Sequence, residues 1–118
     1  MGHARLYDES DPVLARLRTI ALALPEAREV EAWGRPTFRA KKIFALYEDT
    51  GLTFKPAPGE RDMLVHERRV TIPPYWGPSG WLALSLAGDV DWEEVRELVT
   101  DSYRQVALVR MLKALDGS

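Results

Sequence analysis

The residues that could do chemistry in this sequence are cations and aromatic side chains between positions 33 and 76. Lys and Arg neutralise phosphates and release counterions, and nearby rings such as Tyr75 and Trp76 can stack on bases. The cations are Arg35, Arg39, Lys41, Lys42, Lys55, Arg68 and Arg69. These types indicate a surface for a polyanion such as DNA. The same pattern also fits a solvated sheet face whose inward aromatic rings support outward charges.

Two aromatic segments near these cations allow both a structural and a functional interpretation. Residues 33–36, Trp-Gly-Arg-Pro, are typical of a tight turn, because Gly and Pro each fix a special backbone geometry. We expect Trp33 to anchor the core beside this turn, whereas Arg35 has no such explanation and is the first residue to mutate. Residues 75–78, Tyr-Trp-Gly-Pro, belong to a loop. Loops often carry binding residues, but this one could equally be a lid on the open face of a sheet.

Catalytic and metal-binding chemistry has little support in the residue types present. His66 is the one internal histidine and the chain has no cysteine, so a metal site or a catalytic triad lacks partners. The carboxylates that could act as acid and base fall at expected turns and helix starts, where capping explains them; they are Asp49, Glu60, Asp62, Asp89 and Asp91. We therefore expect a protein that is not an enzyme and that holds no metal and no cofactor.

The composition sets the broad class. With 118 residues, 46% of them hydrophobic, the chain can bury a core as one domain, with residues 1–10 as a flexible N-terminus. The absence of cysteine excludes disulfides and thiolate metal sites and fits a reducing compartment. No apolar run approaches the ~20 residues that span a bilayer, and the N-terminus lacks the apolar stretch of a signal peptide. A cytoplasmic protein with no membrane partner is expected.

Charge is distributed unevenly along the chain. The net charge of −2 excludes a wholly basic, histone-like binder. Residues 33–69 hold eight Lys or Arg against five Asp or Glu, whereas residues 1–32 carry a net −2 and residues 70–118 a net −3. The basic excess therefore coincides with the predicted sheet, and the acidic excess with the terminal helices.

The elements that must position these residues begin with an amphipathic helix. Asp11 can cap it and Pro12 suits its first turn, while Pro25 ends it. Its apolar residues recur at helical spacing: Val13, Leu14, Leu17, Ile20, Ala21 and Leu24. Strand-favouring residues between turns predict strands at residues 28–32, 37–39, 43–48 and 52–55. Gly51 is expected to supply the positive φ of the turn before the last of these.

The second half of the chain mixes a short helix with strands. Residues 60–66 predict a short helix with Met63 and Leu64 facing inward. Residues 68–72 form either a short strand or an extended link. The alternation at residues 81–86 predicts a strand with its leucines on one face.

A final helix, which the apolar residues between 108 and 115 either extend or follow, completes the order of elements. Prolines and glycines exclude regular structure over residues 73–80. Asp91 with Glu94 resembles a capping box at the start of the helix, and Gly117 marks its end. The predicted fold is an α+β two-layer sandwich, with a curved antiparallel sheet and the N- and C-terminal helices on one face.

The sequence resembles the MmcQ/YjbR family of small bacterial proteins along nearly its whole length. The segments that carry the resemblance are LPEA at 24–27, WGRPTF at 33–38, KIFA at 42–45, WLAL at 81–84, VDWEE at 90–94, SYR at 102–104 and VA at 106–107. The resemblance implies a two-layer fold with a curved antiparallel sheet, similar in shape to frataxin and secretion chaperones. It also implies DNA binding through a double-wing arrangement. This sequence departs from that pattern in its acidic balance and its lack of a long basic tail, which argues against strong duplex binding.

Two functions follow as expectations. The first is weak, largely sequence-independent DNA binding through the basic sheet and hairpin face, carried by the seven cations with Tyr75 and Trp76. The second is a protein-interaction module of chaperone-like shape without a nucleic-acid role. Such a module would use an exposed apolar surface around Trp76 and Trp81, or a free sheet edge. The oligomeric state is left open.

Overall fold

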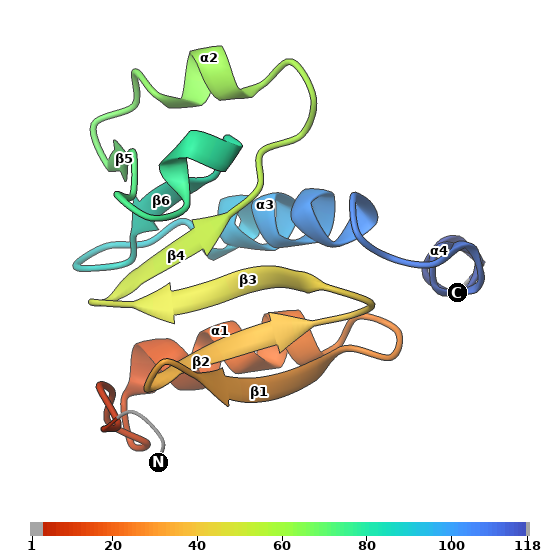
Figure 1. Ribbon diagram of the computed structural model, residues 1–118, viewed down its shortest axis with the longest axis horizontal. Helices are drawn as coiled ribbons and strands as arrows, with labels where there is room; N and C mark the ends of the chain where they lie inside the picture. Colours follow the sequence, from red (N-terminus) through yellow and green to blue (C-terminus); the bar gives the residue numbers. More distant parts are fainter. Residues whose placement is uncertain (1–3, 118) are drawn as a thin grey trace.

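Two layers build the structure, a computed structural model that describes residues 4–117 (Figure 1). Its elements are α1 (Pro12–Leu22), β1 (Arg28–Ala32), β2 (Arg35–Arg39), β3 (Ile43–Glu48), β4 (Gly51–Phe54), α2 (Arg61–Leu64), β5 (Val70–Thr71), the 3-10 turn η1 (Gly77–Ser79), β6 (Leu82–Ser85), α3 (Trp92–Arg104) and α4 (Val109–Asp116). One layer is an antiparallel sheet of strand order β1-β2-β3-β4-β6-β5. The other contains α1 and α3, which pack together behind the sheet. The predicted α+β sandwich is confirmed.

Local capping fixes where α1 begins. The Asp11 carboxylate accepts a hydrogen bond of 2.9 Å from the Val13 N–H, and Pro12 occupies the first helical position. The residues that α1 buries are Leu14, Leu17, Ile20 and Ala21. The helix ends at Leu22, slightly earlier than predicted, and Leu24 is buried outside it. The apolar stripe was therefore predicted correctly, whereas the helix end was misplaced.

Alternation along the strands gives the sheet one face against the helices and one face away from them. Across the sheet, Phe38 pairs with Ala45, Ala45 with Phe54, and Phe54 with Leu82. These four side chains are buried in the core below α1 and α3. Neighbouring residues of a strand point to opposite faces. The line of paired residues that begins at Thr37 therefore faces away from α1 and α3.

An irregularity in β3 lets two consecutive residues reach the core. Phe38 pairs with Ala45, but Arg39 pairs with Ile43, so Phe44 has no partner across the β2–β3 ladder. A bulge of this kind changes the side to which the following residue points. Phe44 and Ala45 are both fully buried, and the Phe44 ring packs edge-on against Tyr103 of α3 at 5.3 Å. The bulge therefore fixes how α3 docks on the sheet.

Two tight turns connect strands of the sheet, one between β1 and β2 and the other between β3 and β4. Trp33 and Gly34 both have positive φ between β1 and β2, and Asp49 and Thr50 both have positive φ between β3 and β4. Two positive-φ residues in a two-residue loop suit the twist of antiparallel strands. The prediction that Gly51 supplies the positive φ was wrong, because Gly51 is already the first residue of β4.

The segment between β4 and β6 has little regular structure. α2 is a single turn in which Leu64 is buried but Met63 is 71% exposed, so the prediction that Met63 faces inward was wrong. Successive helical positions point about 100° apart, and in α2 only Leu64 faces the core. β5 is a two-residue strand, and the proline-rich segment that follows holds only η1.

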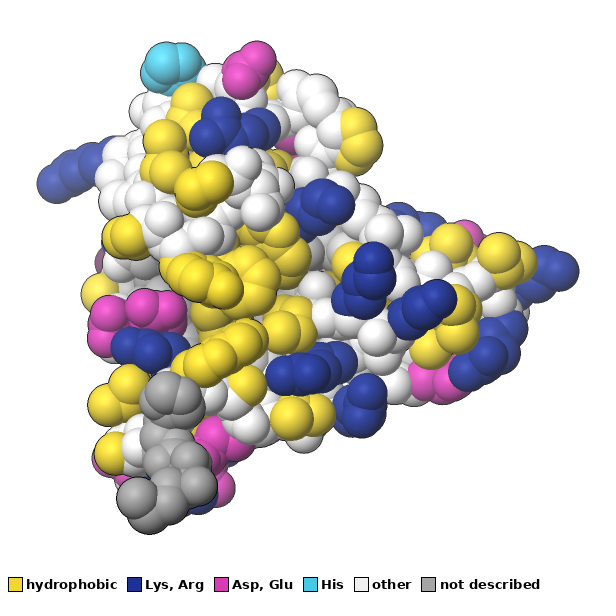
Figure 2. All heavy atoms as spheres, viewed as in Figure 1, with side chains coloured by type: hydrophobic (Ala, Val, Ile, Leu, Met, Phe, Trp, Pro, Cys, Tyr) yellow, Lys and Arg dark blue, Asp and Glu magenta, His cyan; other side chains and the backbone are white. Residues whose placement is uncertain are grey.

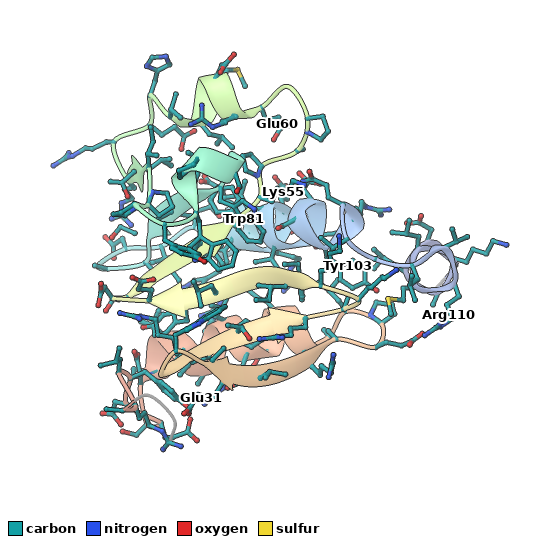
Figure 3. All side chains as sticks on the ribbon, viewed as in Figure 1. Glu31, Lys55, Glu60, Trp81, Tyr103 and Arg110 are labelled. Carbon is teal, nitrogen blue, oxygen red and sulfur yellow. The ribbon has the colours of Figure 1, made fainter. Side chains whose placement is uncertain are left out.

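The last apolar residues follow α3 as a separate helix, α4, which is one of the two alternatives that the sequence left open. α3 begins at its cap, Asp91, whose carboxylate accepts hydrogen bonds from Glu93 and Glu94 N–H. α4 lies at the end of the molecule, where the Arg110 guanidinium reaches Glu26 at 2.8 Å (Figure 3). Within the described chain, no helix combines the length and apolar character needed to cross a bilayer.

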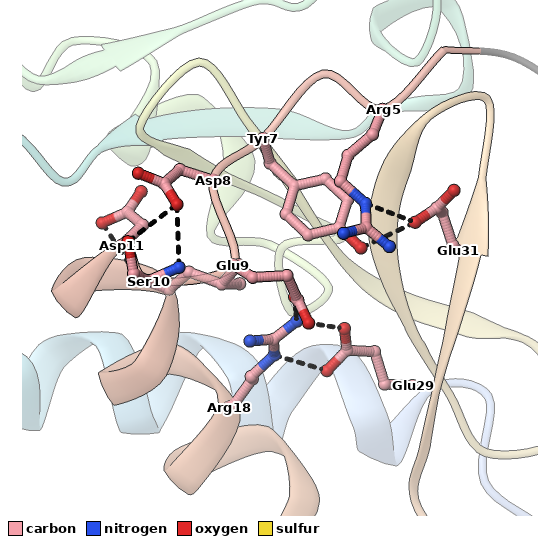
Figure 4. Close-up of polar contacts among 10 residues, drawn as sticks. Arg5, Tyr7, Asp8, Glu9, Ser10, Asp11, Arg18, Glu29 and Glu31 are labelled. Atoms are coloured by element: carbon pink, nitrogen blue, oxygen red, sulfur yellow. Dashed lines mark hydrogen bonds and ion pairs between the residues drawn. The ribbon is translucent and has the colours of Figure 1, made fainter.

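The N-terminal segment packs against β1 and α1 (Figure 4). Of the residues expected to be flexible, 1–3 lie outside the described part of the chain. The Tyr7 hydroxyl donates to Glu31 at 2.6 Å, and Arg18 bridges Glu9 and Glu29. This bridging joins α1 to the edge strand of the sheet.

Candidate nucleic-acid interface

The face of the sheet turned away from α1 and α3, called here the open face, is partly covered by the loop of residues 72–81. Thr37, Leu46 and Thr53 pair across this face, yet all three are buried. Leu46 adjoins Trp76 of the loop in one shallow hollow, and Thr53 adjoins the start of the loop in another. The loop therefore lies as a lid on the open face, one of the two arrangements that its sequence allowed.

Four aromatic side chains, called here the aromatic row, lie on the open face, with Trp76 in contact with each of the other three. The Trp76 ring lies 4.9 Å from Trp81, 6.2 Å from Trp33 and 5.6 Å from Tyr75, measured between ring centroids. Trp81 and Trp76 are largely covered, but Trp33 is 46% exposed and Tyr75 80% exposed. The expectation that Trp33 anchors the core was wrong, because the positive-φ turn points it along the open face. Figure 2 shows this hydrophobic band with Lys and Arg side chains beside it.

Three predicted lysines surround a hollow of about 590 Å³, called here the lysine hollow. Lys41 and Lys42 are exposed in the turn between β2 and β3, and Lys55 follows the end of β4. Trp76 and Trp81 form its aromatic side, and Figure 3 labels Lys55 beside Trp81. The remaining lining is Ile43, Gln105, Val106, Ala107 and Leu108. The hollow thus combines cations with aromatic surface and has no carboxylate in its lining.

The two predicted arginines of β2 also lie on the open face, but they are half-buried and have partners. The Arg39 Nε–H donates to the Thr37 hydroxyl at 3.1 Å. Arg35 lies 3.7 Å from a Glu48 carboxylate oxygen and 3.5 Å from the carbonyl oxygen of Trp33. Both Arg35 distances exceed those of a good hydrogen bond, so its guanidinium keeps donors for a ligand.

Arg68 and Arg69 do not line the lysine hollow, although Arg69 borders the open-face hollow that contains Thr53. They precede β5, the edge strand at the opposite side of the sheet from β1. Both line a separate hollow with carboxylates, among them Glu67 and Glu94. Burial, and then the charge of Glu67, raises the pKa of Glu94 above its usual value. The seven cations are therefore not gathered in one hollow. Lys41, Lys42 and Lys55 line the lysine hollow, whereas β6, inserted between β4 and β5, places Arg68 and Arg69 beside the edge strand.

The remaining polar groups include one histidine and several carboxylates. His66 is exposed near α2. Within residues 4–117, no three His, Cys, Asp or Glu side chains are grouped so that they could hold a metal ion. The described surface therefore offers cations and rings as its main chemical feature.

Trp81 and Gln105 of the lysine hollow were not among the predicted DNA contacts. Trp81 could have been found, because the alternation that buries Leu82 on one face places Trp81 on the other. Gln105 had no local signal. Its amide donates to the carbonyl oxygens of Lys55 and Pro56 at 3.0 Å, which fixes the backbone next to the Lys55 side chain. That contact depends on where the end of α3 docks.

Comparison with known proteins places the fold. The Deinococcus radiodurans protein DR2400, of the domain family DUF419, is similar with a TM-score of 0.68 and 23% identity over 79% of this chain and 77% of that one. A protein from Pseudomonas syringae is similar with a TM-score of 0.58 and 16% identity over 68% of this chain and 86% of that one. At these identities the likeness shows the fold alone, and no curated protein matches the chain. The family model YjbR matches residues 22–105, well over half of the chain, and the protein therefore belongs to the YjbR family.

Proposed function

We propose that this protein binds DNA weakly and largely independently of sequence, through the open face of its sheet. The observation that supports this most directly is the lysine hollow, where Lys41, Lys42 and Lys55 adjoin Trp76 and Trp81. Single-stranded DNA can use both kinds of side chain at once, because its phosphates bind lysines and its bases stack on aromatic rings. The hollow falls in the size range of ligand sites on proteins, about 300–1,000 Å³.

The binding mechanism follows from what each group can do. An ammonium group is a point charge that neutralises a phosphate without reading the base beside it. The exposed Tyr75 ring and the partly exposed Trp33 ring offer π-faces, which stack on any base. Stacking requires unpaired bases, so the preferred form is single-stranded DNA. The acidic surfaces elsewhere on the molecule keep the affinity low.

We propose binding without catalysis at this surface. The lining of the lysine hollow consists of lysines, apolar side chains and one amide. Such a set can hold an anion, but it supplies neither a nucleophile paired with a base nor a metal site.

Salt dependence tests the proposal quantitatively. The logarithm of the association constant falls with the logarithm of salt concentration by about 0.7 per phosphate neutralised on a single strand. Lys41→Ala with Lys42→Ala should therefore reduce the magnitude of this slope by about 1.4 and weaken binding at low salt. The measurement is fluorescence anisotropy of a labelled thymidine oligonucleotide, titrated at several salt concentrations.

The chain offers a matched control. Arg68→Ala with Lys113→Ala also removes two exposed positive charges, neither of which lines a hollow of the open face. This variant should keep the wild-type slope. Equal losses in both double variants would show that only overall charge matters, and no binding at low salt would end the proposal.

A protein partner is a second candidate, favoured by the apolar side chains that the open face leaves exposed. Ile72 is 57% exposed and Tyr75 80% exposed, beside the exposed Trp33 ring. Contiguous apolar surface of this kind marks interaction sites. This function predicts self-association or partner binding that is lost in Tyr75→Ser but is unaffected by the Lys41 and Lys42 substitutions. Size-exclusion chromatography with light scattering measures the self-association.

A further inference from the structure

A second hollow on the open face, of about 220 Å³, lies beside the lysine hollow and differs from it in chemistry. It is lined by Trp33, Arg35, Leu46, Glu48, Tyr75 and Trp76. Trp76 lines both hollows, so the two are neighbours. This second hollow, called here the base hollow, is too small for a drug-sized ligand and suits a single flat group.

The aromatic rings around the base hollow have faces available to a ligand. The Trp33 and Tyr75 rings meet the Trp76 ring at 72° and 76°, which are edge-on contacts rather than stacked ones. An edge-on pair leaves a ring face uncovered, and both outer rings are substantially exposed. Leu46 adds an apolar surface below them. A planar ring system is therefore the shape of ligand that these side chains would hold.

The polar side chains of the base hollow are one cation and one anion, which interact only loosely. Arg35 and Glu48 approach to 3.7 Å, beyond hydrogen-bonding distance. The guanidinium therefore retains donors, and the carboxylate retains acceptors. Because the two charges offset each other, the hollow favours a neutral group over a phosphate or an ammonium. Such a group must present both acceptors and donors on its edge.

We infer that the base hollow binds the guanine base of single-stranded DNA. Guanine has two neighbouring donors, N1–H and the N2 amino group, which a carboxylate such as Glu48 can accept together. On the adjoining edge it has two acceptors, O6 and N7, which an arginine such as Arg35 pairs with in bidentate fashion. Adenine, cytosine and thymine lack the two neighbouring donors. This inference rests on the proposed function, since the phosphates next to that base would lie in the lysine hollow.

Base substitution in a uniform strand tests the inference. Thymidine oligonucleotides carrying isolated guanines should bind about fivefold or more tightly than the same strands carrying adenine or cytosine. Glu48→Gln should abolish this preference, because the amide that replaces the carboxylate cannot accept from both guanine donors. Asp49→Asn is the matched control, because it removes a carboxylate one position away that does not line the base hollow. It should retain the guanine preference.

The outcomes separate this inference from the function on which it rests. If all strands bind equally well and the Lys41 and Lys42 substitutions still reduce the salt slope, the guanine site is refuted and the DNA-binding proposal survives. If Glu48→Gln and Asp49→Asn change the preference equally, the carboxylate effect is general charge and the inference also falls. No binding to any strand would remove both.

Discussion

The Ser102 hydroxyl joins α3 to two strands, and its removal tests how the open face is held in place. Ser102 is fully buried. Its hydroxyl donates to the carbonyl oxygen of Phe44 at 2.6 Å and accepts from the Lys55 N–H at 3.0 Å. The first partner is the bulged residue of β3, and the second carries a side chain of the lysine hollow.

The expected cost of Ser102→Ala can be estimated from these two contacts. The substitution leaves a buried carbonyl and a partly buried N–H without this partner, at about 1–3 kcal/mol for each such group. We expect the free energy of unfolding to fall by about 2–4 kcal/mol. For 118 residues the unfolding entropy near the melting temperature is about 0.25 kcal/mol/K, so Tm should fall by about 8–16 °C.

Urea unfolding followed by tryptophan fluorescence measures this cost. The midpoint should move to lower urea while the m-value stays constant, because the surface exposed on unfolding is unchanged. Ser85→Ala is the matched control. Its hydroxyl is on an exposed residue and accepts one longer hydrogen bond, 3.3 Å from the Ala87 N–H. That variant should lie within about 0.5 kcal/mol of the wild type.

One result would refute the reasoning. If Ser102→Ala and Ser85→Ala unfold at the same urea concentration with the same m-value, the Phe44 and Lys55 backbone groups do not depend on the hydroxyl. The docking of α3 would then rest on apolar contacts such as that between Phe44 and Tyr103.

Two further predictions concern other tightly packed positions. Gly34→Ala should lower the free energy of unfolding by at least about 1–2 kcal/mol in thermal melts, because φ is +77° and a Cβ would lie 2.1 Å from the Ala4 carbonyl oxygen; an unchanged Tm would contradict this. Burial, then the hydrogen bond to Asp11, raises the pKa of Tyr47 to about 12. A raised pKa means that the folded state favours the protonated hydroxyl. The stability that this hydroxyl contributes is present below pH 10.0 and is lost as the pH rises towards 12. Tyr47→Phe should flatten that fall in pH-dependent melts, and an identical fall would argue against it.

Most of the fold was predictable because its signals are local. The Asp11 and Asp91 caps, the apolar stripe of α1 and the alternation of β6 each depend on a few neighbouring residues. The errors were local too. The sequence did not show that Asp49 and Thr50, rather than Gly51, adopt positive φ, because the hairpin register decides which residues form the loop.

The candidate site was predictable as a set of residue types but not as an arrangement. The grouping of Lys41 and Lys42 follows from their place in one turn. Their meeting with Lys55 depends on strand pairing, and their meeting with Trp76 depends on a proline-rich loop folding back over the sheet. No nearby residues encode either event.

By itself the sequence determined the helices, the strands, the two-layer class and the chemical character of the basic segment. The tertiary structure alone decided which cations share a hollow, because the insertion of β6 between β4 and β5 separates Arg68 and Arg69 from the lysine hollow. It also decided that Trp33 is exposed and that Glu48 faces Arg35. The physical reason is that periodicity and caps act within a few residues, whereas strand order and loop docking join residues far apart in the chain.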